Sequence, residues 1–451
     1  MSAKKEKQAE STVTVRPVTA AKMIKHCMKN KRPVMLWGPP GIGKSDIVHS
    51  IGKSYEMRDE DGKLTKPPRP VIDIRLLLHD PTDLKGMPYY DFNEGRMKWS
   101  QPSELPMVVS WDEVVECDAA LTSAKNDLDA ENNKATHDHK TIHEIELRIQ
   151  SLNNRLKMLT GAYAMKDAII FLDELVSAPQ TVQGAAFQLI LDRRIGEYKL
   201  PDGVDMIAAG NREIDRGVSF KMPKPLQNRF IHLNLDVNFE DWQAWAVNHG
   251  VSADVVGFLT SHTHHLFDFD PRSPSNAFAT PRSWKHLSDL LKDTSDFVGS
   301  DGKRSALFPL VAGTIGDGLA TEFMTHIECA AKLPSPMDIL TGRDMSELKV
   351  KEISAMYSLV ISMCYRLKDT NVIAKDNMKA GLKGEHVLTI DTWYKYVDNF
   401  FTYMLDNFQA EMCVLGAKIA VKDYDLKFDA KAIPSFKRFF DKYGSMILDK
   451  T

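Results

Sequence analysis

The stretch GPPGIGKS, from Gly38 to Ser45, has the spacing G-x-x-x-x-G-K-S between an apolar run and the segment DIVHSI. This context predicts a strand, a loop and then a helix. Glycines in such a loop let backbone N–H groups approach phosphate oxygens, and the following helix begins with its positive dipole end toward them. Lys44 is expected to reach the β- and γ-phosphates of a nucleotide, and the Ser45 hydroxyl to bind Mg²⁺. The predicted nucleotide contacts are Gly38, Pro39, Pro40, Gly41, Ile42, Gly43, Lys44 and Ser45.

A second chemical feature is the pair of carboxylates that ends the apolar run AIIFLDE. The run predicts a buried strand, which places Asp173 and Glu174 at its carboxyl end. Asp173 is expected to hold Mg²⁺ together with Ser45, and Glu174 to act as the general base for an attacking water. Two adjacent carboxylates beside a phosphate loop therefore predict hydrolysis of the nucleotide as well as its binding.

A sheet and helices are needed to position these residues, and the apolar periodicity predicts both. Strands come first and the sequence from residue 241 onward is mainly helical, which predicts an α/β nucleotide-binding domain followed by helical domains. Residues 86–99 and 193–204 are predicted as β-hairpins. The predicted strands are residues 33–37, 71–76, 168–174, 205–211 and 230–235, and the predicted helices in this part are residues 19–30, 43–55 and 181–193.

Residues 113–160 have a different pattern from the rest of the chain. Apolar residues recur there at alternating intervals of three and four in two separate runs, which is the spacing of a coiled-coil seam. The stretch between the runs lacks this pattern and can reverse the chain, so we expect an antiparallel helical hairpin. The alternative is a pair of amphipathic helices packed flat on the domain. The seams are Val114, Cys117, Leu121, Ala124 and Leu128, then Ile142, Ile145, Ile149, Leu152, Leu156 and Leu159; the charged residues expected outside them are Lys125, Asp127, Glu131, Lys134, Glu146 and Arg148.

Length and composition limit the classes of protein to consider. A chain of 451 residues with 43% apolar residues predicts two or three folded domains. The net charge of −3 announces no polyanionic partner, and we see no strong basic stripe with interleaved aromatic residues of the kind expected for a DNA channel. Five scattered cysteines without a CxxC pair and the absence of an apolar run of about 18 residues predict a soluble cytoplasmic protein without a membrane segment.

The order of these motifs is similar to that of the AAA+ ATPases. The phosphate loop, the FLDE strand, MIAAGN ending in Asn211, LQNRF with Arg229 and TPRSW with Arg282 follow one another in that order. The two predicted β-hairpins resemble the helix-2 insert and the pre-sensor-1 hairpin of the MoxR-like branch. The resemblance covers roughly residues 19–292 and implies an AAA+ P-loop module with a five-stranded, mainly parallel sheet, two hairpin inserts and a helical lid. The helical hairpin of residues 113–160 departs from the family, whose members usually have a shorter connection there.

The resemblance implies roles for three more residues. Asn211 would be the sensor-1 residue that orients the lytic water beside Glu174. Arg229 would be the arginine finger that acts on the nucleotide of a neighbouring subunit, and Arg282, in the helical lid, would be the sensor-2 contact. Four other arginines lie close to these motifs and compete with Arg229 for the finger: Arg193, Arg194, Arg212 and Arg216.

Pattern and resemblance together predict an organisation and an activity. The expected parts are a mobile arm (1–18), the AAA+ domain (19–240), a helical lid (241–338) and a helical C-terminal region (339–451), of which the last has no counterpart in the family. The family hydrolyses ATP with Mg²⁺ and assembles as homo-oligomeric rings, most often hexamers. The MoxR-like branch implies remodelling or chaperoning of a protein client, with a von Willebrand A domain as one type of partner; the alternative is a nucleic-acid motor of the McrB or helicase type.

Overall fold

The computed structural model forms two compact units, residues 1–236 and 237–451. Residues 1–12 of the predicted arm, Lys134 and Arg216 lie outside the described residues. Within the described part no helix has the length and apolar character needed to cross a membrane. The described residues are 13–59, 63–100, 102, 104–107, 109–133, 139–215, 220, 222–273, 275–294, 297, 305–382, 384, 387–428 and 433–448.

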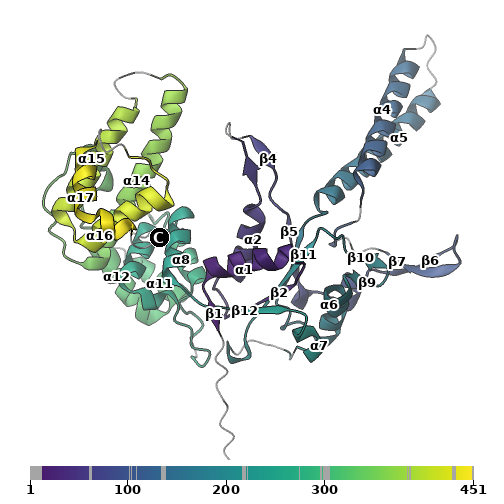
Figure 1. The fold of residues 1–451 in the computed structure, drawn as a ribbon, viewed down its shortest axis with the longest axis horizontal. Helices are drawn as coiled ribbons and strands as arrows, with labels where there is room; N and C mark the ends of the chain where they lie inside the picture. Colours follow the sequence, from purple (N-terminus) through teal and green to yellow (C-terminus); the bar gives the residue numbers. More distant parts are fainter. Residues whose placement is uncertain are drawn as a thin grey trace, which may run out of the picture. The chain divides into compact units, whose positions relative to one another are not determined.

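The first unit is built on a parallel sheet of six strands (Figure 1). In space the strands run β1-β12-β2-β11-β8-β5, so strands that are consecutive along the chain are mostly not neighbours. The α/β class predicted from the sequence is confirmed. The bounds are β1 Thr14–Val15, β2 Val34–Trp37, β5 Val71–Arg75, β8 Ile169–Asp173, β11 Asp205–Gly210 and β12 Ile231–Leu235.

The prediction of five strands was wrong by one. The additional strand is β1, in the segment predicted to be a mobile arm, and it pairs in parallel with β12 through Thr14↔Asn234 and Val15↔Leu235. Two residues carry too little periodicity to be recognised as a strand. A further antiparallel pair, β3 Met57–Arg58 with β4 Leu64–Lys66, was not among the predicted strands.

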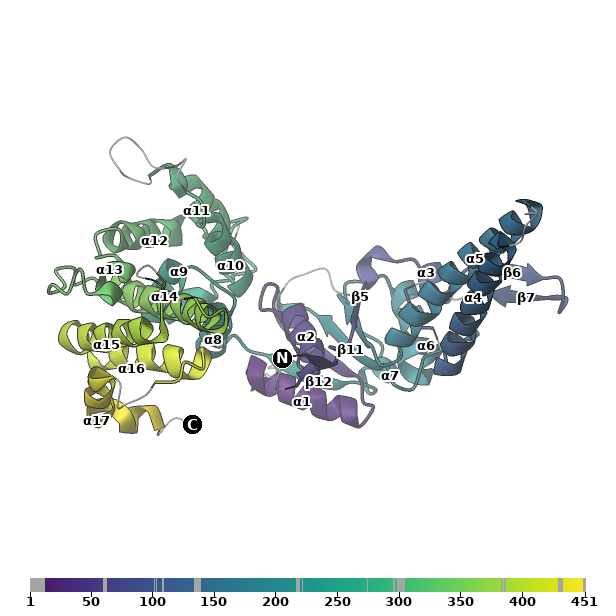
Figure 2. The ribbon, with the colours of Figure 1, turned by 90° about the horizontal axis from the view of Figure 1, so that it is seen from above.

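Helices cover both faces of the sheet (Figure 2). On one side lie α1 and α2, whose buried residues include Ile24, Met28 and Val48. On the other side α6 packs against a core that includes Ile170 and Met206 of the sheet. The bounds in this unit are α1 Pro17–Lys29, α2 Lys44–Lys53, η1 Leu76–Leu78, α3 Pro81–Lys85, α6 Gln180–Asp192, η2 Glu213–Asp215 and α7 Lys224–Gln227.

Both predicted β-hairpins are present. Strands β6 Pro88–Asp91 and β7 Arg96–Trp99 pair antiparallel, as do β9 Arg194–Ile195 and β10 Tyr198–Lys199. The second hairpin is anchored because the buried Tyr198 hydroxyl donates a hydrogen bond to the Pro106 carbonyl at 2.7 Å, and burial raises the pKa of this phenol. The first hairpin exposes large apolar side chains, with Phe92 89% exposed.

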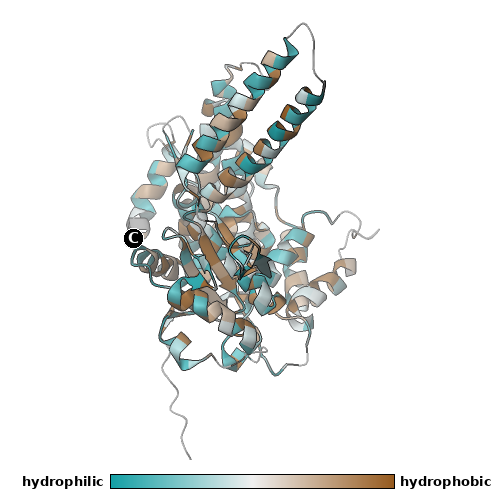
Figure 3. Cartoon of the chain, turned by 90° about the vertical axis from the view of Figure 1, so that its right-hand side faces the viewer, coloured by the Kyte–Doolittle hydropathy of each residue, from teal (hydrophilic) through white to brown (hydrophobic). Residues whose placement is uncertain are grey.

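The predicted helical hairpin is formed by α4 Trp111–Asn132 and α5 His139–Ala164. The two helices lie side by side and project from the sheet (Figures 1 and 3). Its apolar residues form a separate cluster around Val114, Cys117 and Leu159, distinct from the core under the sheet. The alternative of two helices packed flat on the domain is therefore wrong.

One residue of the helical hairpin was placed on the wrong face. Glu131 was expected outside the seam, but its exposed fraction is only 8%. The seam residue Leu128 is three positions before it, so the alternation of threes and fours continues to Glu131 and accounts for its burial on the seam side of α4.

In the described residues of the second unit all regular elements are helices. One continuous core runs from Trp242 to Phe439 and includes residues of both the predicted lid and the predicted C-terminal region. The longest helix, α14, carries twelve buried residues and packs closely against α9. The bounds are α8 Phe239–Asn248, α9 Ala253–Ser261, η3 Thr263–Leu266, α10 Pro281–Leu290, η5 Ser305–Leu307, α11 Phe308–Ile315, α12 Asp317–Ala330, α13 Pro336–Thr341, α14 Ile353–Lys379, α15 Ile390–Asn407, α16 Ala410–Lys418, η6 Ile419–Asp423 and α17 Pro434–Leu448.

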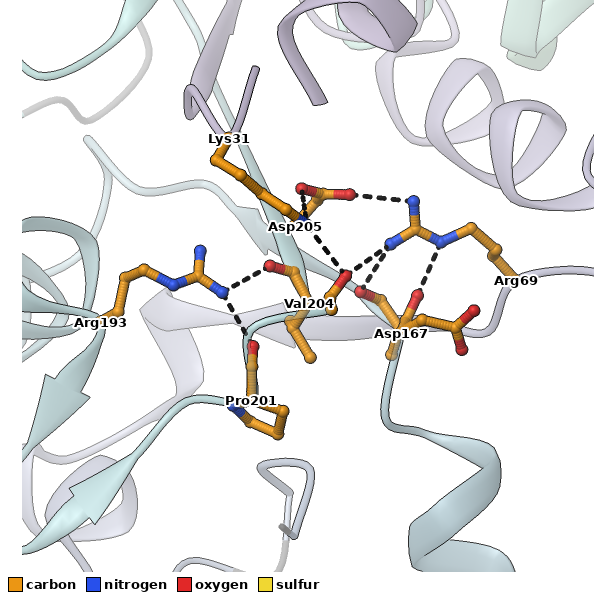
Figure 4. Close-up of polar contacts among 9 residues, drawn as sticks. Lys31, Arg69, Asp167, Arg193, Pro201, Val204 and Asp205 are labelled. Atoms are coloured by element: carbon orange, nitrogen blue, oxygen red, sulfur yellow. Dashed lines mark hydrogen bonds and ion pairs between the residues drawn. The ribbon is translucent and has the colours of Figure 1, made fainter. Parts of the chain in front are cut away.

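A charged network closes the amino-terminal edge of the sheet (Figure 4). The carboxylate of Asp205, at the start of β11, is 5% exposed and accepts from Arg69 at 2.9 Å and Lys31 at 3.2 Å. Arg69 also donates from Nε to the Asp167 carbonyl at 2.6 Å and from Nη2 to the Gly203 carbonyl at 3.1 Å. The network thus joins the starts of β11 and β8 to the segment that leaves α5.

We predict that Arg69→Ala lowers the free energy of unfolding of the first unit by about 3 kcal/mol, because it leaves a buried carboxylate with only the half-exposed Lys31 as partner. Urea denaturation followed by circular dichroism measures the loss. The exposed Arg155→Ala is the matched control and should change the stability by less than about 0.5 kcal/mol. Equal stability of the two variants would contradict the structural role of Arg69.

Candidate functional site

The residues predicted to bind nucleotide and to hydrolyse it lie at the carboxyl ends of three adjacent strands. In the sheet β11 lies between β2 and β8, with Gly210 paired to Trp37 and Ala208 to Leu172. Because parallel strands end at the same edge, the phosphate loop after β2, the carboxylates after β8 and Asn211 after β11 are brought together.

The phosphate loop has the backbone that its glycines were expected to provide. Gly41 and Gly43 have φ of 77° and 86°, in the left-handed region that glycine adopts without strain. Helix α2 then begins at Lys44, so its first backbone N–H groups face the loop. This arrangement can receive phosphate oxygens on backbone donors.

The Lys44 ammonium connects two of the predicted motifs. It donates to the carbonyls of Gly38 at 2.7 Å and Pro39 at 2.9 Å, and to the Asn211 side-chain oxygen at 2.9 Å. A γ-phosphate has oxygens that could replace these acceptors on the same ammonium. The charge that would bind phosphate is therefore held beside the residue expected to orient water.

A separate contact joins the two predicted Mg²⁺ ligands, Ser45 and Asp173. The Ser45 hydroxyl donates to Asp173 Oδ2 at 3.3 Å, across a separation of 128 residues. Hydroxyl and carboxylate oxygens are hard donors of the kind that Mg²⁺ accepts, usually together with water and phosphate oxygens. The residues present therefore fit Mg²⁺ bound beside a phosphate.

Glu174 has an unusual backbone conformation. Its φ is 55°, a value uncommon for a residue other than glycine. The turn is held because the Glu174 N–H donates to Asp173 Oδ1 at 2.9 Å and the Leu175 N–H donates to the Ala209 carbonyl at 3.0 Å. Such strain of about 1 kcal/mol is common at functional sites and is retained only where the surroundings impose it. Here it turns the chain immediately after Asp173.

Arg229 is exposed, whereas two of its rivals are committed to contacts within the unit. Arg212 forms a two-point contact with Asp215, at 3.1 Å from Nε and 3.1 Å from Nη2. Arg193 donates to the carbonyls of Pro201 at 2.8 Å and Val204 at 2.7 Å, which closes the β9–β10 segment (Figure 4). Arg194 is also exposed, so exposure does not distinguish it from Arg229 as the candidate arginine finger.

Arg282 lies in the second unit. It is the second residue of α10, where Thr280 caps the helix and accepts from the Ser283 N–H at 3.1 Å. Its side chain is exposed. A contact between Arg282 and nucleotide therefore stays a prediction.

A link beside the site was missed by the sequence reading. The Trp37 indole donates to His232 Nδ1 at 2.8 Å, and the other ring nitrogen of His232 contacts the Gln227 carbonyl at 2.8 Å. These contacts tie the strand before the phosphate loop to the segment that precedes Arg229. No motif marks His232; only its place in β12, next to β2, reveals the connection.

The sequence matches no protein-family model and no curated protein. Similar solved structures include a Cytophaga hutchinsonii protein assigned as an ATPase (12% identity, 97% of this chain and 91% of that chain, TM-score 0.28). Others are NtrX from Brucella abortus with ATP (11%, 83% and 70%, TM-score 0.30) and a RuvB variant from Thermotoga maritima (12%, 85% and 86%, TM-score 0.27).

We predict that Lys44→Ala abolishes ATP binding, whereas Glu174→Gln binds ATP and loses turnover by about 100-fold or more, because only the proposed base is removed. Titration with a fluorescent ATP analogue and an assay of phosphate release separate the two effects. Glu197→Gln, at an exposed carboxylate of the β9–β10 turn, is the control and should keep both properties. Equal loss of binding in Lys44→Ala and Glu174→Gln would refute the role given to Glu174.

Proposed function

We propose that this chain is an ATPase of the AAA+ type. The observation that carries the proposal is the meeting of Lys44 with Asn211 and of Ser45 with Asp173 at one edge of the parallel sheet. A nucleotide-binding protein without turnover would need the loop and the metal ligands. It would not need Asn211 and Glu174 beside them.

In the proposed reaction different residues of the chain bind the phosphates, bind Mg²⁺ and activate the attacking water. The backbone donors of the loop and the Lys44 ammonium hold the β- and γ-phosphates, while Ser45 and Asp173 hold Mg²⁺, which supplies neutralisation of phosphate charge when bound. Glu174 accepts the proton of the attacking water, and Asn211 orients that water. Adenine is proposed as the base from the family resemblance.

The proposed arginine finger requires a second subunit. Arg229 is exposed and follows a segment tied to β2 through His232, so its placement is linked to the phosphate loop of its own subunit. The fixed fork of a guanidinium suits stabilisation of charge on a γ-phosphoryl group presented by a neighbour. We therefore propose a homo-oligomeric ring, with six subunits as the family's commonest number, and Arg282 as an additional contact to the nucleotide.

The proposed work is remodelling of a protein client. The support is the α4–α5 hairpin, which has its own apolar cluster and carries charged residues on its exposed surface. It leads directly into β8, the strand that ends at Asp173, through a junction held by Arg69. An element that is exposed and joined to the proposed catalytic strand suits contact with a protein partner, for which a von Willebrand A domain is one type.

A nucleic-acid motor is the second candidate. The specific observation in its favour is the row of lysines on α1, Lys22, Lys25 and Lys29, which composition alone does not reveal. Stimulation of turnover distinguishes the two candidates, since a protein partner should raise it in one case and DNA or RNA in the other.

The ring can be tested by mixing inactive subunits. Arg229→Ala and Lys44→Ala subunits should each be inactive alone and should regain part of the ATPase activity when mixed, because some interfaces then pair an intact site with an intact finger. Phosphate release measures the recovery, and Arg194→Ala in place of Arg229→Ala tests the remaining rival. Mixed oligomers without recovery would show that Arg229 does not act across an interface.

The helical hairpin can be tested by deletion. Replacing residues 116–158 with a short Gly/Ser linker should leave basal ATPase within about threefold, under ~1 kcal/mol in barrier, because the hairpin cluster is separate from the sheet core. Clients retained by Glu174→Gln in ATP should be lost from the corresponding deletion. Thermal melting is the control: a melted or insoluble variant would mean that the hairpin completes the fold.

A further inference from the structure

A strongly basic segment opens the first unit. Between residues 13 and 45 the chain has seven lysines and arginines and no Asp or Glu, although the whole chain has 58 basic and 61 acidic residues. The members are Arg16, Lys22, Lys25, Lys29, Lys31, Arg32 and Lys44. Overall composition therefore conceals a local excess of positive charge.

Three of these lysines share one face of α1. Lys22, Lys25 and Lys29 are separated by three and four residues, so they lie in a row about 10 Å long. The helix buries Ala20, Ile24 and Met28 against the unit, which leaves Lys22 and Lys29 exposed and Lys25 half-exposed. None of the three lysines pairs with a described carboxylate.

The row continues onto neighbouring elements through one aromatic ring. Tyr55, just after α2, has Lys25 Nζ and Lys66 Nζ each 5.8 Å from its ring centroid and Arg69 Cζ at 5.2 Å. Lys66 is the last residue of β4. The segment that follows β4 is held against α2, because the Arg69 backbone N–H donates to the Gly52 carbonyl at 3.0 Å. Figure 1 shows α1, α2 and the β3–β4 hairpin within the same unit.

Folding does not explain this basic surface, which we define as the α1 lysines Lys22, Lys25 and Lys29 together with Lys66, which meets Lys25 at the Tyr55 ring. Like charges three and four residues apart destabilise a helix by a few tenths of a kcal/mol per pair. Elsewhere the chain balances such charges, as where Lys285 pairs with Asp289 at 2.7 Å. Charges within about 10 Å of one another act together at ordinary ionic strength, so the surface attracts polyanions.

We propose that the basic surface binds the phosphodiester backbone of nucleic acid. A row of lysines contacts successive phosphates without reading sequence, and an aromatic ring among cations is typical of surfaces that follow a nucleic-acid strand. An anionic membrane is less suited, because an interfacial helix needs a free apolar face and that of α1 is buried in the unit. The surface uses neither the phosphate loop nor Glu174, so the proposal does not depend on ATP hydrolysis.

The test measures binding of a fluorescein-labelled 30-nucleotide DNA strand, and of the corresponding duplex, to the full chain carrying Lys44→Ala in the absence of ATP. The triple variant Lys22→Gln, Lys25→Gln, Lys29→Gln should weaken binding tenfold or more at 50 mM salt. It should also reduce the slope of log affinity against log salt by about 2 for the single strand and by nearly 3 for the duplex, since three phosphate contacts are lost. The control removes the same charge from exposed lysines of the second unit, Lys332→Gln, Lys349→Gln and Lys351→Gln, and should leave both quantities unchanged.

Three results would overturn the proposal. The first is no binding of either DNA at 50 mM salt, and the second is equal weakening by the triple and control variants. The third is binding of phosphatidylserine vesicles that neither DNA displaces. Circular dichroism of each variant verifies folding, and Lys66→Gln, outside α1, should weaken DNA binding even if the triple variant is unstable.

Discussion

The parallel pairing of β11 with β2 on one side and β8 on the other is the constraint on which the site depends. Each strand contributes one chemical group at its carboxyl end, and the hydrogen-bonded register fixes their order: phosphate loop, Asn211, Asp173. The contacts of Lys44 with Asn211 and of Ser45 with Asp173 follow from that order. A different strand order would leave every sequence motif intact, but it would separate the loop, Asn211 and Asp173 in space.

The two edges of the same sheet have different tasks. The carboxyl edge holds the polar groups of the site, whereas the amino edge is closed by Asp205 between Arg69 and Lys31. Strand β8 is short and buried, and it connects the junction after α5 at one edge with Asp173 at the other. A rigid element of this kind is a physical route by which contact at the helical hairpin and events at the phosphate site could influence each other.

Charge is also distributed unevenly over the first unit. Helix α4 carries seven acidic residues and one lysine, whereas α1 carries lysines and no acidic residue. The net charge of −3 is a sum over the whole chain, so it reveals neither the acidic helix α4 nor the basic helix α1. A partner of either sign could therefore be attracted to a defined part of this unit, which composition alone does not suggest.

Much of this protein follows from local sequence. The strand, loop and helix around Gly38–Ser45, the place of Asp173 and Glu174 at the end of a buried strand, both β-hairpins and the pairing of α4 with α5 were predicted from the sequence, because glycine spacing and apolar periodicity act over a few residues. The sequence did not predict β1, the burial of Glu131, the His232 link or the basic surface. Tertiary structure decided these features: the Lys31–Asp205 and Ser45–Asp173 contacts span 174 and 128 residues. Pairing at such separations depends on which strands are neighbours in the sheet, and no local periodicity encodes that choice.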